Sequence, residues 1–274
     1  MKISLFYIDA FTSDVFKGNT AAVCLLESWL PDEVLQSIAA EHNLSETAFV
    51  VKDEKDVFQL KWFTPKVEVD LCGHATLAAA HVLFNIYTFT HKGFRFRTKS
   101  GILPVQHDED GKITLDFPVF QANSFVPPAI LKEGLGKDFV EVYKSRDLMV
   151  VFNSEKDILE LAPDFEKLKM LDCLGIIATA PGENSDYVLR FFAPGAGINE
   201  DPVTGSVQSI LAPYWGKRLK KNTLSVRQLS ERTGEMSCKL NGDRVLISGH
   251  AITYMQGTIN ISIRPQNTLM PFNY

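Results

Sequence analysis

Apolar and polar residues alternate along four segments near the beginning of the chain, a pattern typical of β-strands with one buried face. The segments are residues 3–11, 21–27, 47–53 and 57–65. Residues 31–42 predict a helix, because Asp32 and Glu33 lie in its first turn, where the helix dipole favours negative charge. The first part of the chain is therefore predicted to be rich in strands, with one early helix.

The rest of the chain also mixes both kinds of element. We predict helices at residues 128–134 and 159–168, and buried strands at 148–152 and 176–180. Between the two parts, residues 117–130 contain prolines and show no clear periodicity. We therefore place an N-terminal half at residues 1–117 and a C-terminal half at 118–250. A last strand, within residues 251–274, is expected to return to the first half.

Two segments of the chain resemble each other: FQLKWFTPKVEVDLCGHATLAAAHVLF (58–84) and YVLRFFAPGAGINEDPVTGSVQSILAPYWG (187–216). In each, a strand pattern ends in aromatic–Phe–x–Pro, an acidic loop follows, and a glycine, Gly73 or Gly205, opens an apolar helix. A strand, a further glycine and a hairpin come next in both. The further glycine is Gly101 after the first segment and Gly234 after the second. Gly73 and Gly101 are 28 positions apart, and Gly205 and Gly234 are 29 positions apart. This spacing predicts duplication of one unit, with chance similarity of two β-rich segments as the alternative.

Composition narrows the class of protein. The chain has 274 residues, 45% of them apolar, which is enough to bury a core. Its net charge of −5 provides no basic surface for nucleic acid, and no apolar run is long enough to span a membrane. The first strand contains Asp9 and leads to no signal-peptide cleavage site. Four scattered cysteines predict no disulfide framework and suit a reducing cytoplasm.

The helix starts at Gly73 and Gly205 are candidate anion sites. A helix N-terminus offers unpaired N–H donors and a partial positive charge, and glycine lets a ligand approach the backbone. If the two halves pack as pseudo-symmetric partners, both starts face a shared site for a carboxylate. The alternative is a packing role alone. Two acidic residues lie near these starts: Glu46 at a helix–strand junction, and Asp201, four residues before Gly205.

Four motifs in this order resemble the phenazine biosynthesis PhzF-like family, and in particular its phenazine-biosynthesis-like-domain proteins. They are GNTAAVCLL, SETAFV, FTPKVEVDLCGHATLAAA and FFAPGAGINEDPVTGSVQSILAPYW. The resemblance extends from Asp9 to about Thr258. It implies an α+β fold of the diaminopimelate-epimerase-like type, with two pseudo-symmetric domains that each wrap strands around a central helix. It also implies an active site between the domains, and a homodimer is plausible.

The resemblance further implies a cofactor-independent isomerase that moves a proton between carbons of a small carboxylic acid. Glu46 matches the glutamate that carries the proton, and His74 and Asp201 match the histidine and the acid that assist it. The substrate-binding positions are matched by Gly73, Gly205 and Ser206. The resemblance thus implies no cofactor. We also expect no metal, because the histidines of the chain show no spacing typical of metal ligands.

One departure separates this chain from the amino-acid racemases of the same fold. Those enzymes use a cysteine at each helix start, whereas here Cys72 lies beside the first start and Ser206 beside the second. Racemisation by two thiols is therefore disfavoured, and Cys72 is interpreted as a packing or wall residue. A hydrolase using Ser45 or Ser206 lacks the G-x-S-x-G motif. A non-catalytic protein that binds small acids or other proteins on the same fold remains the main alternative.

Overall fold

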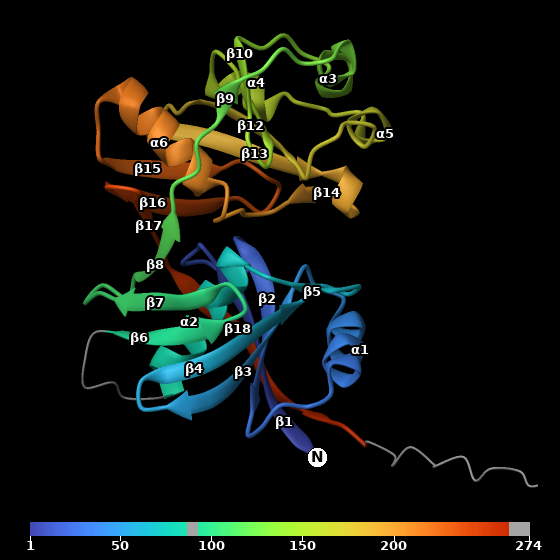
Figure 1. Cartoon of the computed structure of the whole chain (residues 1–274), viewed down its shortest axis with the longest axis vertical. Helices are drawn as coiled ribbons and strands as arrows, with labels where there is room; N and C mark the ends of the chain where they lie inside the picture. The colour runs from blue at the N-terminus through green and yellow to red at the C-terminus, as the bar shows by residue number, and fades with distance from the viewer. Residues whose placement is uncertain (87–92, 263–274) are drawn as a thin grey trace, which may run out of the picture.

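The computed structural model describes residues 1–86 and 93–262, and these form two lobes stacked along the long axis of the molecule (Figure 1). The lower lobe in Figure 1 holds β1 (Lys2–Ala10), β2 (Asn19–Leu26), α1 (Asp32–His42), β3 (Thr47–Glu54), β4 (Val57–Phe63), β5 (Glu68–Val69), α2 (Gly73–Ile86), β6 (Gly93–Thr98), β7 (Gly101–His107), β8 (Ile113–Pro118) and β18 (Ala251–Asn260). The upper lobe holds β9 (Asn123–Ser124), α3 (Ala129–Leu135), β10 (Glu141–Lys144), β11 (Leu148–Val151), α4 (Glu155–Leu159), α5 (Phe165–Leu168), β12 (Ile176–Pro181), β13 (Tyr187–Ala193), β14 (Ile198–Asp201), α6 (Gln208–Leu219), β15 (Thr223–Gln228), β16 (Gly234–Asn241) and β17 (Arg244–Gly249). A short 3-10 turn, Pro194–Ala196, separates β13 from β14.

The pairing of strands repeats between the lobes. In the lower lobe β2 runs parallel to β3, β3 runs antiparallel to β4, and β4 runs parallel to β6. In the upper lobe β11, β12, β13 and β15 repeat these three relations in the same order. The antiparallel sets β6–β7–β8 and β15–β16–β17 follow. These pairings confirm the predicted duplication and extend it, because β1–β2 also matches β10–β11.

Each lobe wraps its strands around one buried helix. In α2 every residue from Gly73 to Ala80 is buried, and its run of alanines lets strands approach from several sides. In α6 the Trp215 ring is buried and stacks on Tyr187 with the ring centroids 5.7 Å apart. By contrast, α1 lies on the outside of the lower lobe (Figure 1). The predicted α+β architecture around two central helices is therefore observed.

One predicted helix is wrong. Residues 159–168 do not form a single helix; α4 ends at Leu159 and α5 begins at Phe165. Pro163 lies between them and disfavours helical geometry at the residue before it. Asp164 then caps the second helix, because its side chain accepts a hydrogen bond from the N–H of Lys167.

The lobes are joined by backbone pairing as well as by side chains. β8 pairs antiparallel with β17 from the Ile113–Gly249 pair to the Pro118–Arg244 pair. β18 leaves the upper lobe and pairs with β1 along the lower lobe. The division of the chain between residues 117 and 118 stays a prediction. Residues 263–274, the end of the expected last strand, lie outside the described residues, and so does His91. Within residues 1–86 and 93–262, no helix has the length and apolar character needed to cross a membrane.

Phe11 fills the junction between the lobes. It follows β1 with a φ of 62°, and its side chain is fully buried. A Cβ added at Gly249, at the end of β17, would lie 2.5 Å from the Cδ1 of this ring, and one at Gly205 would lie 3.2 Å from its Cζ. The ring therefore fits against the upper lobe only because these two positions carry no side chain.

We predict that Gly249→Ala destabilises the protein by about 1–3 kcal/mol, because the buried ring of Phe11 has to shift to admit a methyl group. The matched control is Gly257→Ala in β18, where nothing lies within 4 Å of an added Cβ. That control should stay within about 0.5 kcal/mol of the parent. Urea unfolding at equilibrium measures both variants, and equal midpoints for the two would contradict this role of Phe11.

Candidate active site

The two predicted helix starts meet at the junction of the lobes. A Cβ built on Gly73 would lie 3.5 Å from the Cα of Gly205 and 3.6 Å from the backbone nitrogen of Ser206. A methyl group there would fill the space between the two backbones. α2 begins at Gly73 as predicted, but α6 begins only at Gln208, after a turn over residues 205–207. The free N–H groups of the second start therefore belong partly to this turn.

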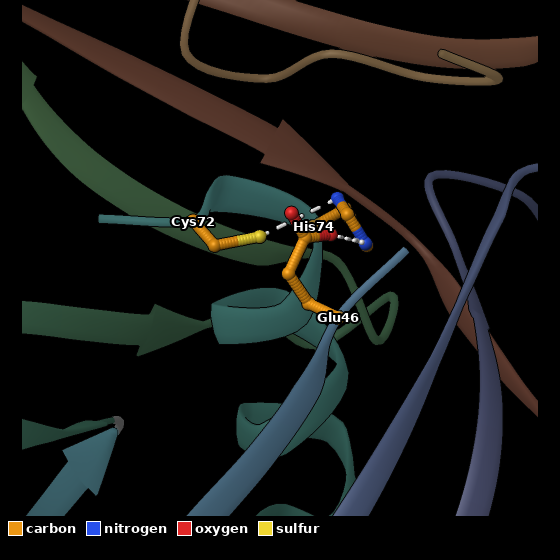
Figure 2. A group of neighbouring side chains, drawn as sticks. All are labelled: Glu46, Cys72 and His74. Carbon is orange, nitrogen blue, oxygen red and sulfur yellow. Dashed lines mark hydrogen bonds and ion pairs between the residues drawn. The ribbon is translucent and has the colours of Figure 1, made fainter. Parts of the chain in front are cut away.

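Glu46 and His74 point toward each other at the first helix start. Glu46 immediately precedes β3, and His74 is the second residue of α2 (Figure 2). The Oε2 of Glu46 lies 3.1 Å from the Nε2 of His74, and the two side chains are only 14% and 6% exposed. Apart from this contact with each other, neither of these buried atoms has a hydrogen-bond partner among the described residues. Two polar atoms thus face each other in a buried position, and no other group of the described residues forms a hydrogen bond with them.

Asn19 connects the two lobes at this point, and the sequence analysis did not identify it. It is the first residue of β2 and is 1% exposed. Its amide nitrogen donates to the Oδ1 of Asp201 (2.8 Å) and to the carbonyl oxygen of Val203 (3.0 Å). The same nitrogen lies 3.2 Å from the Nδ1 of His74. The sequence signal for Asn19 is an amide residue at the start of an apolar strand, because a buried amide needs hydrogen-bond partners.

The hydrogens on this amide restrict the protonation of His74. An amide group has two hydrogens, and Asp201 and Val203 supply two oxygen acceptors for them. The Nδ1 of His74 is therefore free to carry its own proton, directed at the Sγ of Cys72, 3.5 Å away. With Nε2 facing the Glu46 carboxylate, the arrangement favours an imidazolium ring that carries a proton on each nitrogen.

Asp201 lies at the end of β14, on the upper-lobe side of the site. Its carboxyl accepts from Asn19 and from the hydroxyl of Thr204. The side-chain amide of Gln228 donates to its backbone oxygen, at 2.7 Å. The structure thus joins Asp201 to His74 through Asn19, across 182 positions of sequence between Asn19 and Asp201.

Burial and neighbouring charges shift the pKa values of this group. Burial opposes a charge on His74, but the adjacent Cys72 and Glu46 outweigh it and raise the pKa of the ring well above 6.5. Burial is also the main reason that the pKa of Asp201 rises to about 6, although His74 and Thr204 oppose the rise. The pKa of the Cys72 thiol is raised, again chiefly by burial. The site therefore favours a charged histidine.

The cysteine is closer to this chemistry than the sequence suggested. Candidate ligand atoms of Glu46, Cys72 and His74 all lie within 4.8 Å of one another (Figure 2). A thiol, an imidazole and a carboxylate are donors that a zinc-like cation accepts. The spacing of histidines along the chain gave no indication of such a set, because the glutamate comes from a separate element. The interpretation of Cys72 as a wall residue stays a prediction.

Ser206 faces a different partner. Its Oγ lies 3.4 Å from the Nη2 of Arg146. In the described part of the chain, neither Ser206 nor Ser45 makes a hydrogen bond to His74, so the structure offers no serine–histidine pair for a hydrolase. Arg146 was not identified from the sequence either, because it lies on the β10–β11 turn, far along the chain from both helix starts.

Known proteins resemble the chain over nearly its whole length. The family described as phenazine biosynthesis-like protein matches residues 8–257. An uncharacterized isomerase of Pseudomonas aeruginosa is 49% identical, over 95% of this chain and 100% of that protein. Phenazine biosynthesis-like domain-containing protein 2 of Mus musculus is 39% identical, over 94% of this chain and 99% of that protein.

Solved structures agree with the fold. The crystal structure of a PhzF-family phenazine biosynthesis protein of Enterococcus faecalis has a TM-score of 0.92 at 45% identity, covering 95% of this chain and all of that one. A hydroxyproline epimerase of Agrobacterium vitis has a TM-score of 0.61 at 10% identity, covering 94% of this chain and 92% of that one, a likeness of fold alone. The epimerase-like fold is thereby confirmed. With strand pairing, duplicated helix starts and relatives in agreement, this chain belongs to the PhzF-like phenazine biosynthesis family.

Proposed function

We propose that the protein is a cofactor-independent isomerase that moves a proton between carbons of a small carboxylic acid. One observation carries the proposal: the buried Oε2 of Glu46 and Nε2 of His74 lie 3.1 Å apart beside two helix starts, and they face each other rather than any other group of the described residues. Relatives named isomerases and a neighbour named an epimerase support the general class.

The proposed reaction begins with the substrate carboxylate held at the helix starts. The first N–H groups of a helix have no partner within it, so those near Gly73 and Gly205 can donate to carboxylate oxygens. This places the carbon next to the carboxylate beside Glu46. The same donors stabilise the negative charge that develops on the carboxylate when that carbon loses its proton.

Glu46 then acts first as base and afterwards as acid. Its carboxylate takes the proton as the C–H bond breaks, and the electron pair spreads into the carboxylate and an adjacent double bond. The same carboxyl group returns the proton to another carbon, so the reaction needs no oxidant, reductant or second substrate. The charged ring of His74 faces the carboxylate and steadies the charge as it moves. Asp201 fixes the Asn19 amide, whose nitrogen lies beside the His74 ring.

A non-catalytic protein that binds small acids is the second candidate. The helix starts would bind a carboxylate in either case. The two proposals differ in whether Glu46 breaks a C–H bond, so exchange of substrate hydrogen with solvent distinguishes them.

We predict that Glu46→Gln lowers exchange of carbon-bound hydrogen for solvent deuterium by at least about 100-fold, because a positioned acid–base group contributes roughly 10²–10⁴ in rate. The probes are cyclohex-2-ene-1-carboxylate and vinylacetate, whose activated C–H lies between a carboxylate and a double bond. Mass spectrometry after incubation in deuterated water measures the exchange. Glu41→Gln, on the exposed side of α1, is the control and should match the parent. Undiminished exchange by Glu46→Gln would refute the assignment.

We also predict that exchange survives treatment with excess EDTA and a buffer free of metal. In the proposed reaction the carboxylate, the imidazolium and the backbone donors supply all the charge stabilisation. If exchange disappears on chelation and returns with Zn²⁺, then Glu46, Cys72 and His74 act as metal ligands rather than as proposed.

The raised pKa of Asp201 predicts a specific dependence of stability on pH. A carboxyl with a pKa of about 6 when folded and 3.8 in its ordinary state stabilises the fold fully below pH 3.8 and loses that contribution as pH rises through 6. The loss is on the order of 3 kcal/mol at most. The raised pKa of His74 acts in the same direction, but only above pH 6.5.

Asp201→Asn should therefore remove the part of the decline that falls between about pH 4 and pH 6, because the amide does not ionise. Urea unfolding at half-unit pH steps provides the free energies of unfolding. Asp138→Asn is the control, since the Asp138 side chain is 86% exposed. If the free energy of unfolding of Asp201→Asn varies with pH in parallel with that of the parent, the pKa of Asp201 is not raised in the folded protein.

A further inference from the structure

The strand registers allow the two lobes to be matched residue by residue. Thr47 in β3 and Ile176 in β12 each pair with the second aromatic residue of the aromatic–Phe–x–Pro motif in the next strand. Thr47 therefore corresponds to Ile176, and the residue before each corresponds as well. The counterpart of Glu46 is Gly175, which has no side chain that could carry a proton. The proton-transfer carboxylate thus exists in one lobe only.

The same registers match the segment that contains Asn19 to a segment of the upper lobe. Ala22 in β2 pairs with Thr47, and Leu148 in β11 pairs with Ile176. Residues 19–21 therefore correspond to residues 145–147, at the β10–β11 turn. In the lower lobe this segment contacts the residue after the helix-start glycine, through Asn19 and His74. In the upper lobe the matched segment contacts the residue after the helix-start glycine, Ser206, through Arg146, one position after the counterpart of Asn19. Arg146 thus lies at the upper-lobe side of the proposed site.

The hydrogen bonds of Arg146 leave part of its guanidinium unused. Its Nε and Nη2 donate to the Oδ2 of Asp147, at 3.1 and 2.8 Å, and Nη2 reaches Ser206 at 3.4 Å. The Nη1 group has no hydrogen-bond partner within residues 1–86 and 93–262, and the side chain is 41% exposed. Two N–H donors and a positive charge are therefore available to a ligand at this helix start.

Asp147 holds the arginine in this orientation at a cost to the fold. Its side chain is completely buried, and its Oδ1 has no hydrogen-bond partner among the described residues. Burial raises the pKa of this carboxyl, and both the neighbouring Arg146 and the backbone N–H of Gly175 oppose the rise. A buried carboxylate whose charge partner reaches toward solvent is an expensive way to stabilise a protein. It is understandable as a device that positions the guanidinium.

We propose that Arg146 binds a second anionic group of the substrate, so that the site takes small dicarboxylates in preference to monocarboxylates. The inference rests on the proposed function for the place of the first carboxylate at the helix starts. One lobe then supplies the proton-transfer group and the other supplies the cation that selects the substrate. An arginine suits this task because its planar fork binds carboxylates through two parallel hydrogen bonds.

The test compares acids of equal chain length that differ by one carboxylate: malonate with propionate, succinate with butyrate, and glutarate with valerate. Isothermal titration calorimetry on the full-length protein measures each affinity. We expect at least one diacid to bind about 10- to 100-fold more tightly than its partner, the range for a charge-assisted hydrogen-bonded pair. A wild-type protein without any such preference would overturn the proposal.

The variant is the double substitution Arg146→Gln with Asp147→Asn, which removes the cation without leaving its buried carboxylate unpaired. It should bind the diacid no better than the monoacid, while monoacid binding stays unchanged. Arg146→Lys, which keeps the charge but not the fork, should retain part of the preference. The control is Arg97→Gln, because Arg97 is 48% exposed, carries the same charge and pairs with Asp53 on the other lobe. A diacid preference that survives the double substitution would overturn the role of Arg146.

The two proposals fail separately. Glu46→Gln should keep the diacid preference and lose deuterium exchange, whereas the double variant should lose the preference. Exchange that persists in Glu46→Gln counts against the proposed reaction and leaves the role of Arg146 standing. Loss of exchange in Glu46→Gln, together with an intact preference in the double variant, counts against Arg146 alone.

Discussion

The close approach of two backbones at Gly73 and Gly205 is the constraint on which the rest of the site depends. With the glycine carbons almost in contact, the positive end of α2 and the turn that leads into α6 lie at one point. The partial positive charge of a helix start favours negative or polar groups beside it. The lobes supply Glu46, Asp201 and the oxygen partners of Asn19. A carboxylate substrate would add to the same balance of charge.

The duplication accounts for the scaffold, and divergence of its halves accounts for the chemistry. Both lobes use the same strand pairings around a buried helix. At matched positions, however, the lower lobe has Glu46 and His74, whereas the upper lobe has Gly175 and Ser206. A racemase with a base on each face needs two matching groups. One carboxylate suits a proton that leaves and returns on the same side of the substrate.

Burial and neighbouring charges together give His74 and Asp201 their unusual ionisation. Charges removed from water interact strongly, because little solvent remains to screen them. The fold tolerates this since Asn19, Thr204 and Gln228 satisfy most of the polar atoms around Asp201. The atoms of Glu46 and His74 that face each other have no other hydrogen-bond partner among the described residues. Stability is given up at the place where chemistry is proposed, as is common for active sites.

The sequence by itself determined the elements with strong local signals: the alternating strands, the duplicated unit and the helix start at Gly73, because periodicity and glycine act over a few residues. It failed at residues 159–168, where a proline interrupts an apolar pattern, and it extended the second helix too far toward Gly205. Only the tertiary structure decided which side chains meet. Asn19 reaches Asp201 and Arg146 reaches Ser206 across 182 and 60 positions, and contacts at such separations depend on strand register and lobe packing, which no local pattern encodes.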